Sequence, residues 1–177
     1  MKPKPHNQER PPLDSEGLER LALFYVGRYA TTGAKLKTYL ARKVRERGWE
    51  GPAPDFEALV ERFKSLGYID DGAFAAARAA SLQRRGYGER RVAQALQAAG
   101  IGEEDAAEAK AQAREAALAA ALRFAERKRI GPFAAEAPDR EGRHKAFAAM
   151  MRAGHPLEVV RRVLNASPGE IPDSDNI

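Results

Sequence analysis

Cysteine is absent from the 177 residues, so disulfide bonds, thiolate metal sites and a cysteine nucleophile are all excluded. Aromatic residues make up only 7% of the chain, and alanine supplies much of its 44% hydrophobic content. No apolar run reaches the roughly 18 residues of a membrane span, and the opening MKPKPHNQERPP lacks the hydrophobic segment of a signal peptide. These absences predict a cytoplasmic protein with a thin helical core and no membrane partner.

Positive charge is what the sequence has in excess. Thirty Lys and Arg residues face 25 Asp and Glu residues, which gives a formal net charge of +5. A basic balance favours an anionic partner without identifying one. Nucleic acid and an acidic protein groove both satisfy it.

Apolar residues recur at steps of three and four, and strand-like alternation is rare, so the sequence predicts an all-α fold. The first expected helix runs over about residues 18–30. Asp55 and Asp139 are expected to cap later helices, and His155, just before Pro156, is expected to be a cap or a surface residue. The alanine-rich run after Glu103 is too long for one globular helix, so we expect a break near residues 112–115.

The order of helices and turns repeats about every 55 residues: a shift of 56 places Leu36 and Leu40 over Val92 and Leu96. Stacked units of this size bury one another's apolar faces, which predicts three tandem three-helix repeats in an elongated, curved module. A disordered basic tail and a disordered acidic tail flank the repeats. The expected boundaries are tail 1–15, repeats 16–68, 69–113 and 114–166, and tail 167–177.

The most informative segment is the turn in the second repeat, where four arginines surround a tyrosine framed by Gly86 and Gly88. Side chains that leave a turn and the first turn of a helix can approach phosphates or carboxylates, and the tyrosine can stack on a base. The alternative is a solvated turn with the tyrosine packed between helices. The candidate binding residues are Arg84, Arg85, Tyr87, Arg90 and Arg91.

A second basic zone runs from Arg28 to Arg47, where seven cations face the single anion Glu46. These cations cover most of the non-apolar surface of the expected helix. The alternative, a charge run that is only a solvated face, carries equal weight. Besides Arg28, the zone contains Lys35, Lys37, Arg42, Lys43, Arg45 and Arg47. A third group, with Arg123, Arg127, Lys128 and Arg129, is weaker evidence, because it can merely complement a helix carboxyl end.

No catalytic, cofactor or metal site is expected. Asp70 and Asp71 are adjacent, so their side chains point in different directions, and capping of the next helix is their expected role. The three histidines lack ligand spacing. The pair Gly86 and Gly88 follows no expected strand and has no third glycine, so it falls short of a phosphate-binding fingerprint.

The central segment resembles the RecX regulatory family, whose members modulate the RecA recombinase. The resemblance is specific in this unit and extends more loosely over about residues 18–165, although Thr31-Thr32 replaces the family's usual serine and acidic residue. The residues that carry it include Gly67, Tyr68, Asp70, Asp71, Phe74, Gly86, Gly88 and Gly100. Family members consist of three tandem three-helix repeats, which agrees with the periodicity.

The resemblance implies a non-enzymatic regulator that binds the RecA filament in its groove and inhibits strand exchange, ATP hydrolysis and co-protease activity. We expect a monomer, although the sequence does not determine the oligomeric state. Single- or double-stranded DNA is the second expected partner. Two other hypotheses remain: a stand-alone DNA-binding module of the helix-turn-helix kind, and a purely structural helical scaffold. No cofactor is expected in any of the three.

Overall fold

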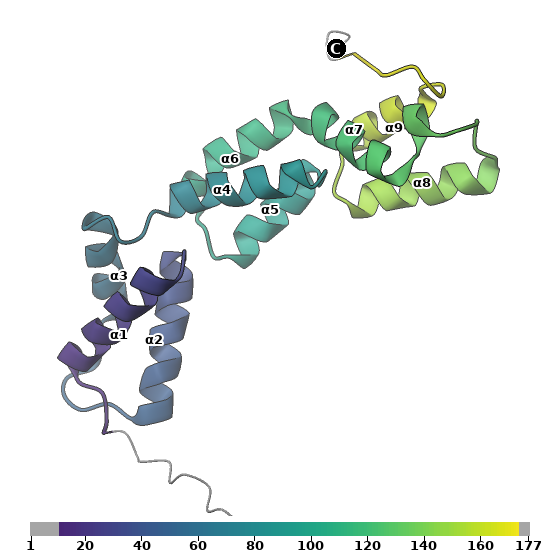
Figure 1. The fold of residues 1–177 in the computed structure, drawn as a ribbon. Helices are drawn as coiled ribbons and strands as arrows, with labels where there is room; N and C mark the ends of the chain where they lie inside the picture. Colours follow the sequence, from purple (N-terminus) through teal and green to yellow (C-terminus); the bar gives the residue numbers. More distant parts are fainter. Residues whose placement is uncertain (1–10, 174–177) are drawn as a thin grey trace, which may run out of the picture. The chain divides into compact units, whose positions relative to one another are not determined.

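A computed structural model describes residues 11–173, and Figure 1 shows helices joined by turns. Within this range the α-helices number nine, and extended pairing is limited to one isolated bridge. No helix in the same range is both long and apolar enough to cross a membrane. The predicted all-α class is confirmed. The chain divides into two compact units, Met1–Asp70 and Asp71–Ile177.

The first unit contains α1 (Ser15–Arg28), α2 (Gly33–Arg47) and α3 (Phe56–Ser65). Before each helix, a short polar side chain accepts a hydrogen bond from a backbone N–H of the first turn. These caps are Asp14, Thr32 and Asp55. The expected cap at Asp55 is therefore present, whereas α1 begins three residues before the expected Leu18, because Asp14 caps it.

Leu13 belongs to the core of the first unit. Its N–H donates to the Gly48 carbonyl at 3.0 Å, and its own carbonyl accepts from the Glu50 N–H at 2.9 Å. The side chain is only 2% exposed, among the apolar residues of α1, α2 and α3. The expected tail boundary at residue 15 did not anticipate this burial. Residues 1–10 of that tail lie outside the described residues.

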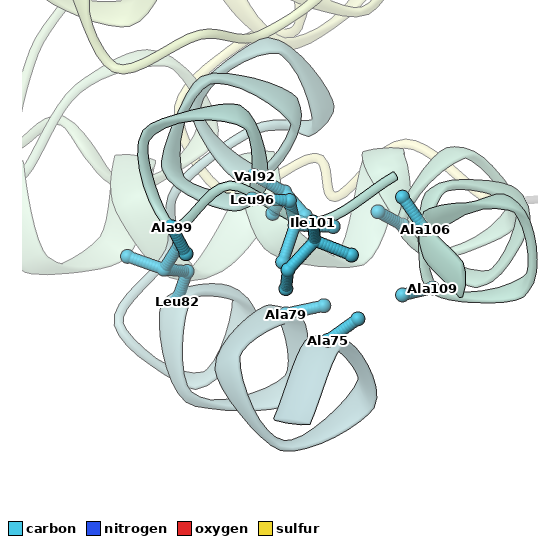
Figure 2. Packing of buried hydrophobic residues seen from close by; sticks show 10 residues of the cluster. Ala75, Ala79, Leu82, Val92, Leu96, Ala99, Ile101, Ala106 and Ala109 are labelled. Atoms are coloured by element: carbon cyan, nitrogen blue, oxygen red, sulfur yellow. The ribbon is translucent and has the colours of Figure 1, made fainter. Parts of the chain in front are cut away.

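The second unit begins with α4 (Asp71–Arg84), α5 (Glu89–Ala98) and α6 (Glu103–Glu115). Figure 2 shows alanines of α4 facing alanines of α6, with larger residues from α5 and the turn after it packed beside them. Alanines at this contact let the helix backbones approach closely, which is how a chain poor in aromatic residues builds a dense core. The alanines are Ala75, Ala79, Ala106, Ala109 and Ala113.

The unit continues with α7 (Ala117–Lys128), the 3₁₀ turn η1 (Gly131–Phe133), α8 (Arg140–Arg152) and α9 (Leu157–Asn165). The expected break in the alanine-rich run falls at Ala116, one residue beyond the predicted range. Asp139 caps α8 by accepting from the Gly142 N–H at 2.7 Å, as predicted. Phe124, Met150, Val160 and Val163 lie in the core of this last helix set.

The segment after α9 includes the described part of the expected acidic tail. The Gly169 N–H donates to the Pro132 carbonyl at 2.8 Å, and the Arg162 guanidinium donates to the Asp173 carbonyl. These contacts hold the segment against η1 and α9 of the same unit. Residues 174–177 of that tail lie outside the described residues.

Candidate functional site

The turn between α4 and α5 lies against the third helix set, and its glycines make this contact possible. A Cβ atom on Gly86 would stand 2.8 Å from the Phe124 backbone nitrogen, and one on Gly88 would stand 2.3 Å from the Gly154 carbonyl oxygen. Gly86 also has a φ of +73°, in the region that favours glycine. The glycines that frame Tyr87 therefore serve close backbone packing.

Main-chain hydrogen bonds complete this junction between the second and third helix sets. The Gly88 N–H donates to the Ala153 carbonyl at 3.0 Å, and the Arg90 N–H donates to the Gly154 carbonyl at 3.1 Å. The first turn of α5 thus uses a donor within the protein rather than offering it to a bound anion. This use of the Arg90 N–H leaves the exposed arginine side chains as the main groups able to bind an anion at this turn.

Tyr87 lies half-buried at the same junction and packs against both hydrophobic cores of the second unit. The Arg85 guanidinium carbon lies 5.3 Å from the centroid of the tyrosine ring, within the range of a cation–π contact. This geometry favours the packing interpretation of Tyr87. Stacking of a nucleic-acid base on this ring stays a prediction.

The four arginines around Tyr87 are all exposed. Arg84, Arg90 and Arg91 form no ion pair with a carboxylate in the described part of the chain. Glu89 is the carboxylate beside these arginines, and it lies 3.9 Å from Arg114 instead. The turn therefore presents uncompensated positive charge to solvent, as a contact for an anionic partner requires.

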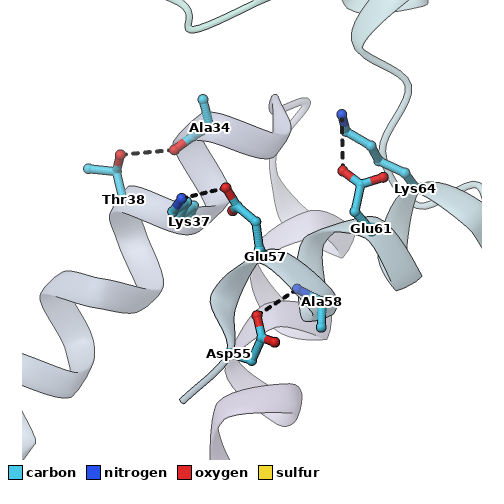
Figure 3. Close-up of polar contacts among 8 residues, drawn as sticks. All are labelled: Ala34, Lys37, Thr38, Asp55, Glu57, Ala58, Glu61 and Lys64. Atoms are coloured by element: carbon cyan, nitrogen blue, oxygen red, sulfur yellow. Dashed lines mark hydrogen bonds and ion pairs between the residues drawn. The ribbon is translucent and has the colours of Figure 1, made fainter. Parts of the chain in front are cut away.

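The basic zone of the first unit lies on α2, except for Arg28 at the end of α1, and much of its charge has partners inside the chain. Lys37 pairs with Glu57 of α3 at 2.6 Å, as Figure 3 shows. Lys43 lies 2.7 Å from Glu46 and Arg42 lies 3.8 Å from it. The hydrogen bond from Lys43 holds the pKa of the Glu46 carboxyl below its usual value.

Two further basic residues of α2 differ in their contacts. Arg47 donates to the Pro11 carbonyl at 2.8 Å, and Arg45 is exposed without an ion pair in residues 11–173. Exposed ion pairs contribute about 0–1 kcal/mol each, so an anionic partner can displace them at little cost. The zone is a solvated face, and its role in binding stays a prediction.

His155 is the clearest correction to the sequence analysis. It is fully buried at the junction, with its ring edge towards Phe124 at a centroid distance of 5.4 Å. Burial in this apolar contact lowers its pKa to about 4. The expectation of a cap or surface residue was wrong, because close packing around Gly154 turns the next side chain inward.

Sequence reasoning missed how α7 contacts the turn. Arg123 donates to the Gln83 carbonyl at 3.1 Å, and Arg127 donates to the Arg85 carbonyl. Their spacing of four residues places both on one face of α7. That spacing was visible, but nothing in the sequence indicated which segment this face contacts.

The residues of the central motif have separate structural roles. Gly67 and Gly100 have φ values of +75° and +71° and end helical segments. Phe74 packs on the core of the second unit. Asp71 is buried, with 7% of its surface exposed. Tyr68 is 53% exposed. No group of three or more His, Asp or Glu side chains able to hold a metal ion occurs within residues 11–173.

Helix triplets in tandem, with exposed arginines at a tightly packed turn, define a helical-repeat protein with basic surfaces. Residues 70–109 match a family model described as RecX, second three-helix domain. The chain is also 34% identical over 160 residues to the regulatory protein RecX of Myxococcus xanthus, with 85% of this chain and 86% of the relative covered. The chain belongs to the RecX family.

Further relatives agree with this assignment. The regulatory protein RecX of Agrobacterium fabrum is 32% identical over 157 residues, which cover 86% of this chain and 84% of the relative. A crystal structure of RecX from Lactobacillus salivarius superposes with a TM-score of 0.62 at 15% identity and covers 85% of this chain and 94% of that one. A second crystal structure, of regulatory protein RecX, gives 0.64 at 19% identity, with 85% and 75% covered. At these identities the two structures support the fold alone.

Proposed function

We propose that this protein is a non-enzymatic regulator that binds the RecA nucleoprotein filament and inhibits strand exchange, ATP hydrolysis and co-protease activity. The observation that carries the proposal is membership of the RecX family, supported by 34% identity over 85% of the chain. The protein acts as a monomer, and DNA within the filament is a second contact.

The exposed cations supply a physical basis for such binding. The arginine turn of the second repeat and the basic face of α2 are separate surfaces of modest strength. A chain of tandem repeats that engages neighbouring subunits of a polymer gains affinity from effective concentration, even when each contact is weak. We therefore attribute binding to several surfaces acting together.

Reversing the charge of two arginines at the turn tests the proposal. The double variant Arg90→Glu/Arg91→Glu reverses two exposed charges in the first turn of α5, where carboxylates suit the helix dipole, so folding should survive. With a preassembled RecA filament on single-stranded DNA, we expect the unchanged protein to slow ATP hydrolysis and co-sediment. The variant should do both at least about tenfold less well, since two charged contacts of roughly 1 kcal/mol each are lost.

The control is Arg140→Glu/Lys145→Glu, which makes the same change in net charge on α8, at residues outside the candidate site. It should inhibit like the unchanged protein. Equal loss in both variants would indicate a general charge effect. If the unchanged protein affected neither ATP hydrolysis nor sedimentation at micromolar concentration, the proposal would fail, and a footprint on DNA without RecA would favour the stand-alone DNA-binding alternative.

A further inference from the structure

A hollow opens in the second unit where the arginine turn meets α7 and α8. Its volume is about 600 Å³, within the range of sites that bind small molecules or single nucleotides. We call it the junction hollow. It is lined by Arg85, Tyr87, Phe124, Arg127, Lys128, Ala149, Arg152 and Ala153.

The charge of the junction hollow has one sign. Four of its lining residues are cations and none is a carboxylate. Lys128 and Arg152 are the last residues of α7 and α8, where a cation complements the helix dipole. That effect explains each residue singly, but it does not explain why cations from three separate segments converge on one concave surface.

Two of these cations are held in place before any ligand arrives. The Arg85 guanidinium lies over the Tyr87 ring, and the Arg127 guanidinium carbon lies 5.6 Å from the centroid of Phe124. Arg127 also donates to the Arg85 carbonyl. A guanidinium held against a ring and a carbonyl loses little freedom on binding, and its remaining N–H groups match the geometry of phosphate oxygens.

The other two cations have no such restraint. Lys128 and Arg152 are exposed and form no ion pair in the described part of the chain. Four like charges around one hollow repel one another, so a bound anion gains their attraction and also relieves this repulsion. The hollow is therefore arranged for an anion.

The lining favours nucleic acid over an acidic protein segment. A half-buried tyrosine and planar guanidinium groups offer sequence-neutral surfaces to a base or sugar, beside the cations that suit a phosphate. A carboxylate side chain would use the charge alone and would gain nothing from the planar guanidinium that lies over the ring. We propose that the junction hollow binds a phosphate and its nucleotide in single-stranded nucleic acid, and that the bound strand ties the second repeat to the third. This deepens the proposed function, on which it rests for its biological setting.

The test measures binding of a fluorescently labelled 15-nucleotide oligo(dT) to the full chain without RecA, by anisotropy over a series of salt concentrations. The variant Lys128→Ala/Arg152→Ala removes the two cations of the hollow that form no ion pair or hydrogen bond within residues 11–173. We expect affinity to fall at least about tenfold and the slope of log affinity against log salt to shrink by about 0.7, since one phosphate contact on a single strand contributes about 0.7.

The matched control is Arg140→Ala/Lys145→Ala, which removes the same charge from α8 outside the hollow and should leave affinity and slope nearly unchanged. Equal weakening by both variants, or by neither, would overturn the proposal. Displacement of the oligonucleotide by poly-glutamate of equal charge at equal concentration would also overturn it, in favour of an acidic protein segment.

Parallel measurements of RecA ATP hydrolysis separate this proposal from the proposed function. Weaker oligonucleotide binding in the Lys128→Ala/Arg152→Ala variant supports the junction hollow, even if the unchanged protein proves to have no effect on RecA. Unchanged oligonucleotide binding with weaker inhibition of RecA would assign the hollow to the recombinase surface and overturn the nucleic-acid site. A rise in melting temperature with oligo(dT) that disappears in the variant would show that the strand binds the folded chain at the hollow.

Discussion

At the scale of single residues, two glycines that each precede a helix show that the effect of an added side chain depends on the atoms around it. Gly88 precedes α5 with φ −79° and ψ 171°, and Gly102 precedes α6 with φ −65° and ψ 162°. Alanine can adopt both conformations without strain. Yet a Cβ atom at Gly88 meets the Gly154 carbonyl, whereas one at Gly102 meets nothing within 4 Å.

Gly88→Ala should therefore lower the free energy of unfolding by about 1–3 kcal/mol through overpacking of the backbone contact. Gly102→Ala should change it by less than about 0.5 kcal/mol, because the added methyl group lies in open space. Urea unfolding followed by circular dichroism measures both. Similar values for the two variants would show that the junction yields to an added methyl group.

His155 makes stability depend on pH. Its pKa is about 4 in the folded chain and about 6.5 when unfolded, so in that window the unfolded state binds more protons. Stability from the neutral ring is complete above pH 6.5 and is lost as pH falls towards 4. Between pH 7 and pH 5 we expect a loss of about 2 kcal/mol, at about 1.4 kcal/mol per pH unit.

The variant His155→Leu should lose this pH dependence, while His144→Leu, at an exposed position, should keep it. Chemical unfolding at pH 7, 6 and 5 provides the measurement. Because the ring nitrogens of His155 have no hydrogen-bond partner among the described residues, the leucine variant should also be no less stable at pH 5. If the stability of His155→Leu changed with pH as steeply as that of the unchanged protein, His155 would not be the source of the pH dependence.

At the scale of helices, small side chains set the distance between α4 and α6. Ala79 is 2% exposed at this contact, whereas Ala77 on the same helix is exposed. Ala79→Leu should destabilise the second unit by about 1–3 kcal/mol, because the added carbons have no space. Ala77→Leu should stay within about 0.5 kcal/mol. Thermal unfolding distinguishes the two, and equal melting temperatures would argue against close packing.

Helix boundaries also show what the sequence could predict. Asp55 and Asp139 were predicted as caps, because a short polar side chain just before a helical pattern of apolar residues indicates the start of a helix. This signal lies entirely in neighbouring residues. The start of α1 was missed although Asp14 carries the same local signal. The burial of Leu13 could not be predicted, since it depends on pairing with residues beside Trp49. His155 was misjudged for the same reason: its burial depends on a partner surface distant in sequence.

The candidate site likewise has one part that neighbouring residues could predict and another that depends on the tertiary structure. The arginines around Tyr87 could be singled out because they are adjacent in sequence. The junction hollow could not, because Arg85, Lys128 and Arg152 come from three segments that only the tertiary structure brings together. Local chemistry can be predicted from the sequence, whereas convergence of charge depends on packing.

At the scale of the whole molecule, the division into two units predicts separable stability and shared binding. Residues 71–177 contain two hydrophobic cores of their own and should fold alone, with cooperative unfolding and a helical circular dichroism spectrum. They lack the basic face of α2. If several surfaces bind the filament together, this fragment should bind about 100-fold more weakly than the full chain.

Co-sedimentation of the fragment and of the full chain with preassembled RecA filaments measures this difference. A fragment that binds as tightly as the full chain would place all of the affinity in residues 71–177. The elongated, curved arrangement expected from the repeats would then have no part in binding.

The contact between Gly88 and Gly154 has a consequence for how the protein tolerates mutation. Because main-chain atoms form this contact, the exposed side chains of the turn can change without separating the two helix sets. Selection for a new ligand could thus rewrite the surroundings of the turn at little cost to foldability, provided that these two positions stay glycine.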